Sequence, residues 1–91
     1  MKEMVLTAEA EGLIIHYFRT QGHLKDDDDD KRIPIYGIAA TKYIDGKEEE
    51  QADAGFISTD ADYVGQLIAM LGKHTVTPLA LCEVLDELLS A

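Results

Sequence analysis

The chain has 91 residues, of which 18 are acidic and 8 are basic, so its formal net charge is −10. This length allows one domain with a modest hydrophobic core that needs neither disulfides nor a metal ion. The negative charge argues against a protein that binds nucleic acids or anionic membrane surfaces, because nucleic-acid phosphates and anionic lipids would both repel the chain. We therefore expect a single domain over residues 1–91, with no nucleic-acid or membrane partner.

The first 58 residues have the composition of strands. β-branched and aromatic residues, which favour strands, are densest in residues 13–19 and 33–44. Residues 4–7 are a candidate for one more strand that turns into the next. The strands are thus expected within residues 3–57, as an antiparallel meander of three or four strands.

The dipeptide Asp45-Gly46 is the strongest short hairpin signal in the chain. A two-residue turn there pairs Ile44 with Lys47. Counting outward, regular pairing places Lys42 opposite Glu49, Ala39 opposite Ala52, Gly37 opposite Ala54, and Ile35 opposite Phe56. One face of the hairpin then collects small residues and is predicted to carry the helices.

The opposite face of the predicted sheet is also partly apolar. It would carry Tyr36, Ile38 and Ala40, with Ile14, His16 and Phe18 on the neighbouring strand. Contiguous exposed apolar patches usually mark contact sites, so Ile14, Phe18, Tyr36 and Ile38 form the candidate interaction face. Two alternatives make these residues ordinary core: the helices pack on opposite faces of the sheet, or the face assignment of the first strand is inverted.

An acidic segment, residues 25–32, separates two of the predicted strands and contains five consecutive aspartates, Asp26 to Asp30. Adjacent carboxylates repel one another and cannot be buried, which predicts a solvated loop. A calcium loop needs spaced oxygens, a central glycine and a distal glutamate, and this segment has none of that spacing.

Two helices are predicted after the strands, at about residues 60–72 and 78–90. Thr59 and Thr77 are the expected N-caps, and Pro78 suits the first position of the second helix. The first apolar stripe consists of Val64, Leu67, Ile68 and Leu71, and the second of Leu81, Val84, Leu85 and Leu88. Both stripes are predicted to pack into the core, which makes the fold class α+β.

Catalytic and metal-binding motifs are not found in the sequence. His16, His23 and His74 lack metal-ligand spacing, and there is no phosphate-binding glycine loop, nucleophile elbow or paired cysteine motif. The single cysteine, Cys82, lies beside the second apolar stripe and is expected to be a buried, inert thiol. We expect a non-enzymatic protein without a cofactor or metal, located in the reducing cytoplasm.

The chain resembles a known family over most of its length, chiefly in its C-terminal half. The residues that carry the resemblance are Ser58-Thr59-Asp60, Val64, Leu67, Leu71, Val76-Thr77-Pro78, Leu81, Val84 and Leu88. At these positions the chain is similar to a family of short uncharacterised bacterial proteins, which are found in anaerobic Gram-positive species. The family is described as a domain of unknown function. The resemblance implies a small cytoplasmic α+β protein and supplies no catalytic residues.

Two functional hypotheses follow. The first is a non-enzymatic interaction module that acts as a homodimer or binds a protein partner through the open sheet face. The second is a regulatory protein that binds a small ligand or a cation. Concentration-dependent dimerisation would favour the first, whereas a monomer that only a cation or metabolite stabilises would favour the second.

Overall fold

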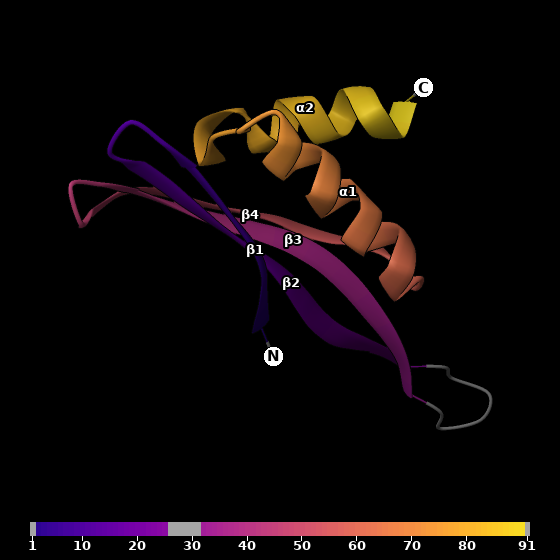
Figure 1. Ribbon diagram of the computed structural model, residues 1–91. Helices are drawn as coiled ribbons and strands as arrows, with labels where there is room; N and C mark the ends of the chain where they lie inside the picture. The colour runs from indigo at the N-terminus through magenta and orange to yellow at the C-terminus, as the bar shows by residue number, and fades with distance from the viewer. Residues whose placement is uncertain (1, 26–31, 91) are drawn as a thin grey trace.

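The computed structural model describes residues 2–25 and 32–90. Four antiparallel strands form one sheet in chain order, and two helices follow (Figure 1). The strands are β1 (Lys2–Ala10), β2 (Leu13–Lys25), β3 (Arg32–Ile44) and β4 (Lys47–Ser58), and the helices are α1 (Ala61–Lys73) and α2 (Pro78–Ser90). The predicted α+β meander with two C-terminal helices is confirmed, and the sheet has four strands.

Left-handed two-residue turns join the first and last pairs of strands. Glu11-Gly12 has φ values of 38° and 83°, and Asp45-Gly46 has φ values of 50° and 82°. Positive φ at both central residues is characteristic of a type I′ hairpin turn, which Asp-Gly adopts readily. The predicted hairpin is confirmed, and Ile44 pairs with Lys47.

A bulge in β4 then shifts the register by one residue from the predicted one. Lys42 lies opposite Glu50, whereas regular pairing would place it opposite Glu49. Ala52 consequently faces Ala40. Because side chains alternate between the two faces of a strand, a shift of one residue exchanges the two faces of β3 relative to β4. The predicted helix-facing set of β3 is therefore wrong by one residue.

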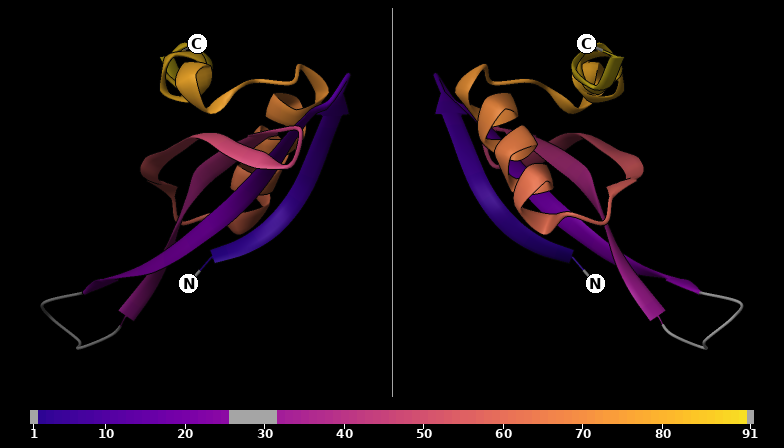
Figure 2. Two further views of the ribbon diagram at one scale, coloured as in Figure 1. Left: turned by 90° about the vertical axis from the view of Figure 1, so that its left-hand side faces the viewer. Right: turned by 90° about the vertical axis from the view of Figure 1, so that its right-hand side faces the viewer.

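The hydrophobic core lies between one face of the sheet and both helices, so the alternative with helices on opposite faces is wrong (Figures 1 and 2). The sheet contributes residues from the middle of β2 and β3. Ile15, Tyr17 and Ile38 have no exposed surface, and Ala40 is 1% exposed. Burial of such side chains is the main stabilising contribution in a domain of this size, at roughly 1.5–3 kcal/mol for each large one.

The two helices lie mainly over opposite edges of the sheet. Helix α1 packs chiefly on β1, β2 and β3 and less on β4, and α2 packs on β4 and β3. The predicted stripe of α1 is confirmed by its buried residues Val64, Leu67, Ile68 and Leu71. In α2, Leu81 and Leu85 are buried, but Val84 and Leu88 are only partly buried.

The element boundaries differ slightly from the predicted ones. The N-cap of α1 is Asp60, one residue after Thr59, and its carboxylate accepts hydrogen bonds from two backbone N–H groups of the first turn. β2 and β3 extend into the predicted acidic loop, where Lys25 pairs with Arg32. The rest of that loop, residues 26–31, lies outside the described residues.

Candidate interaction surface

The face of the sheet opposite the helices carries a group of apolar and aromatic side chains. Along β2, Ile14, His16 and Phe18 alternate with the buried Ile15 and Tyr17 and therefore point to this opposite face. Directly paired residues of antiparallel strands share a face, so Met4 of β1 and Tyr43 of β3 join them. We call Met4, Ile14, His16, Phe18 and Tyr43 the open face.

His16 is the centre of the open face. Its Nδ1 lies 2.8 Å from the sulfur of Met4. The imidazole stacks on the ring of Phe18 with 6.3 Å between the centroids, and it meets the ring of Tyr43 edge-on at 5.2 Å. Aromatic pairs at these separations contribute about 0.5–1.5 kcal/mol beyond simple burial, so both ring contacts favour this arrangement of the cluster.

The open face is nevertheless accessible. Met4 is 53% exposed, and Ile14, His16, Phe18 and Tyr43 are all partly exposed. Within the described part of the chain, no helix covers this face (Figures 1 and 2). Because most isolated surface apolar residues need no explanation, it is the contiguity of these five side chains that indicates a contact surface.

Charged residues of opposite sign lie at the two ends of the open face. At one end, the Nζ of Lys2 lies 4.4 Å from the centroid of the Phe18 ring, a cation–π contact. At the other end, Glu9 pairs with Ile14, and Glu48 pairs with Tyr43. The surface is therefore polarised along the strands.

The structure brings together only part of the predicted interaction face. Ile14 and Phe18 lie on the open face, whereas Ile38 is completely buried beneath the helices and Tyr36 packs against the same core. The prediction that Tyr36 and Ile38 lie on the open face is wrong. The bulge in β4 shifts its pairing with β3 by one residue beyond Lys42 and so exchanges the two faces of β3. In β2, Ile14 and Phe18 lie on the face that was predicted for them, so the alternative in which the faces of this strand are inverted is wrong.

Sequence reasoning missed Met4 and Tyr43. The available signal was strand pairing, because Met4 lies opposite Phe18, and Tyr43 lies opposite Ile14. That signal is hidden in β1 by an irregularity between Met4 and Leu6, which changes which residues share a face.

The whole chain, residues 1–91, matches the model of a family of unknown function, DUF6514. The chain belongs to this family. The predicted resemblance to a family of unknown function is thus confirmed. No curated protein and no solved structure matches the chain.

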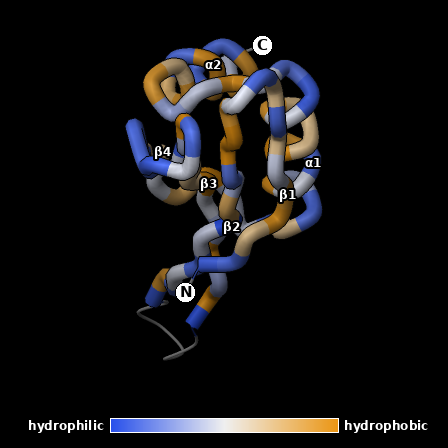
Figure 3. The backbone as a smooth tube through the Cα atoms, turned by 60° about the vertical axis from the view of Figure 1, so that its left-hand side comes forward, coloured by the Kyte–Doolittle hydropathy of each residue, from blue (hydrophilic) through white to orange (hydrophobic). Residues whose placement is uncertain are grey.

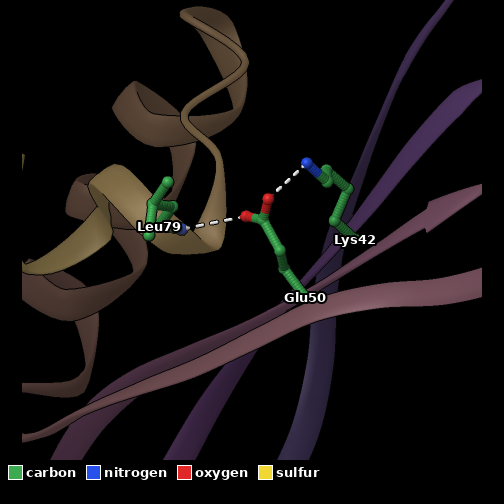
Figure 4. A network of polar contacts seen from close by, with 3 residues as sticks. All are labelled: Lys42, Glu50 and Leu79. Carbon is green, nitrogen blue, oxygen red and sulfur yellow. Dashed lines mark hydrogen bonds and ion pairs between the residues drawn. The ribbon is translucent and has the colours of Figure 1, made fainter.

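Polar contacts on the helical side have a structural role. Glu50 of β4 accepts a hydrogen bond from Lys42 Nζ at 2.5 Å and another from the backbone N–H of Leu79 at 3.2 Å (Figure 4). The hydrogen bond from Lys42 lowers the pKa of the Glu50 carboxyl. Since Leu79 lies in the first turn of α2, the Glu50 carboxylate also lies near the positive end of the helix dipole, which is a stabilising interaction. Glu50 thus supports the start of α2. The predicted N-cap Thr77 directly precedes this helix, and its backbone carbonyl accepts a hydrogen bond from the N–H of Ala80 at 3.0 Å.

Among residues 2–25 and 32–90, no group of three or more His, Cys, Asp or Glu side chains is arranged to hold a metal ion. The prediction of a buried Cys82 is wrong, because this residue is exposed on α2; it forms no disulfide. Neither described helix combines the length and the apolar character needed to cross a membrane. The open face is the candidate site, because its apolar side chains are contiguous and partly exposed.

Proposed function

We propose that this protein is a non-enzymatic, homo-oligomerising interaction module, in which two copies stack their sheets through the open face. The observation that carries the proposal is the aromatic cluster around His16, which is contiguous, ordered by its own contacts and accessible. Two sheet faces of this kind pack about 10 Å apart with interdigitated side chains. Such packing would cover Met4 and Phe18 of both copies.

The charges at the ends of the open face favour a second copy as the occupant. Most homodimers have a two-fold axis, and each residue then contacts a different residue of the other copy reciprocally. If the axis crosses the strands at the centre of the face, β1 of one copy lies over β1 of the other, and Lys2 of each copy approaches Glu9 of the other. The interface would gain two sets of opposite charges, although the net charge of −10 slows association at low salt.

The cellular setting belongs to the same proposal. We place the protein in the cytoplasm of a bacterium, as its resemblance to short proteins from anaerobic Gram-positive species implies. A single cysteine that forms no disulfide is consistent with a reducing compartment.

Sedimentation equilibrium over a range of protein concentrations tests the proposal. The wild type should dimerise, and Phe18→Glu should remain monomeric, because it places a carboxylate at the centre of the apolar contact. The matched control is Leu79→Glu, which adds the same charge at a residue that is 84% exposed on the helical side. A wild type that stays monomeric at all concentrations, or a Leu79→Glu variant as monomeric as Phe18→Glu, would contradict the proposal.

A charge exchange tests the orientation of the two copies. Lys2→Glu should weaken the dimer, since like charges would then face each other across the interface. Adding Glu9→Lys should restore dimerisation, because each new lysine faces the new glutamate of the other copy. Lys2 and Glu9 lie near opposite ends of β1, so a restoring effect cannot arise within one copy. A double variant as weak as Lys2→Glu would exclude this two-fold arrangement.

A further inference from the structure

An apolar crevice separates the two helices. No Cα atom of α1 lies within 8 Å of a Cα atom of α2, and both views in Figure 2 show the helices diverging from their linker. Helices that pack together have axes 8–10 Å apart, so these two do not pack on one another. The space between them is a cavity of about 210 Å³, lined by Met70, Leu71, His74, Val76, Val84 and Leu88.

Several apolar side chains in the walls of the crevice are left partly exposed to water. Met70 is 44% exposed, and Val84 and Leu88 are partly buried although their spacing placed them in the predicted core stripe. Figure 3 shows hydrophobic and hydrophilic positions alternating along α2. The apolar surface of α2 is thus wider than the sheet beneath it can cover.

The size of the crevice restricts what can occupy it. Pockets for small molecules usually measure about 300–1,000 Å³, so this cavity is too small for most of them. The cavity is large enough for one large apolar side chain of a partner. Amphipathic helices dock in hydrophobic grooves by inserting apolar side chains in this manner.

The charges of α2 restrict the occupant further. Glu83, Asp86 and Glu87 are exposed, and the helix contains no basic residue. Glu87 follows Val84 by three residues and therefore lies along the same side of α2 as the crevice. The ion pairs formed by the described residues are Arg19–Glu3 and Lys42–Glu50, and neither involves α2.

We propose that this crevice binds a basic amphipathic helix of another protein. One large apolar side chain of that helix enters between Met70 and Val84, and its Lys or Arg residues lie beside Glu83 and Glu87. A second copy of the chain fits poorly, because its own α2 would bring three further carboxylates to the same place. The crevice is on the opposite side of the sheet from the open face, so the proposal does not depend on dimerisation there.

A model peptide provides the test, because the protein contains no tryptophan. The probe is a Leu- and Lys-rich amphipathic helical peptide with one central Trp, and its fluorescence is followed during titration with the full chain. Binding should shift the Trp emission to shorter wavelength, and Met70→Glu should weaken binding at least about tenfold. Leu79→Glu, which adds the same charge to exposed surface elsewhere, and Phe18→Glu on the open face should bind like the wild type.

Charge variants separate a specific contact from general attraction to an acidic protein. Glu87→Lys and Asp86→Lys change the net charge equally, but Asp86 borders a different hollow, between α2 and β4. Glu87→Lys should weaken binding several-fold more than Asp86→Lys, and the difference should shrink in high salt.

Three outcomes would overturn the proposal. The first is an unshifted Trp emission, and the second is equal weakening by Glu87→Lys and Asp86→Lys. The third is a wild type that does not bind the peptide but self-associates, with a self-association that Met70→Glu abolishes. The crevice would then bind a second copy of the chain. Circular dichroism of each variant shows whether it is folded, and Leu88→Ala, which enlarges the crevice without adding charge, replaces Met70→Glu if that variant unfolds.

Discussion

The hydroxyl of Tyr17 donates a hydrogen bond of 2.6 Å to the backbone carbonyl of Val76. Tyr17 is in the middle of the sheet and Val76 is in the linker between the helices, so this contact joins elements 59 residues apart in sequence. The same hydroxyl lies 3.3 Å from the carbonyl of Leu71 near the end of α1. The linker that sets the separation of the two helices is therefore fixed to the sheet by one side chain.

Tyr17→Phe tests this link. Removing the hydroxyl leaves the ring in the core but takes a hydrogen-bond donor from a partly buried carbonyl, which should lower the free energy of unfolding by about 1–3 kcal/mol. Urea denaturation followed by circular dichroism measures the change. Tyr63→Phe is the control, since Tyr63 is 38% exposed and should tolerate the loss. Equal midpoints for the wild type and Tyr17→Phe would show that the hydrogen bond contributes nothing net.

Alkaline pH should act on the same group. Burial raises the pKa of Tyr17 from 10.0 to about 12. The unfolded chain therefore loses the tyrosine proton first, so the stability due to this group is complete below pH 10 and is lost as the pH rises toward about 12. The decline should reach at most about 1.4 kcal/mol per pH unit in that window. Because Tyr17→Phe has no hydroxyl to ionise, its stability should decline less steeply over the same pH range.

Glu50 should produce the opposite pH dependence. Its pKa is lowered in the folded state, chiefly by the hydrogen bond from Lys42, so its contribution is complete above the unfolded pKa and is lost as the pH falls through the folded value. Glu50→Gln should lower the urea midpoint at neutral pH and reduce its sensitivity to acid. Glu49→Gln, which removes an exposed carboxylate one residue earlier, is the matched control. If both variants respond to acid alike, Glu50 does not stabilise the start of α2.

The sequence was sufficient for the elements but insufficient for their register. Hairpin turns and helix caps are local signals, and the residues at Asp45-Gly46 and along α1 agree with the apolar periods around them. The bulge in β4 lies beside the contacts of Glu50 with Lys42 and with α2, and the contact with α2 is not local in sequence. For this reason the sequence placed half of the predicted interaction face, Tyr36 and Ile38, on the wrong side of the sheet.

The register also decides whether the fold tolerates a lysine in place of Ile38. Ile38 has no exposed surface, so Ile38→Lys buries an unpaired ammonium and should cost more than about 3 kcal/mol, a large part of the stability of a small domain. Phe18→Lys places the same charge on the partly exposed open face, where the ammonium can reach water, and should cost distinctly less. Thermal unfolding at a concentration where the wild type is monomeric compares the two without any contribution from association. If Ile38→Lys costs no more than Phe18→Lys, Ile38 lies on the open face beside Phe18, as the regular register without the bulge requires, and the two faces of β3 must be exchanged again.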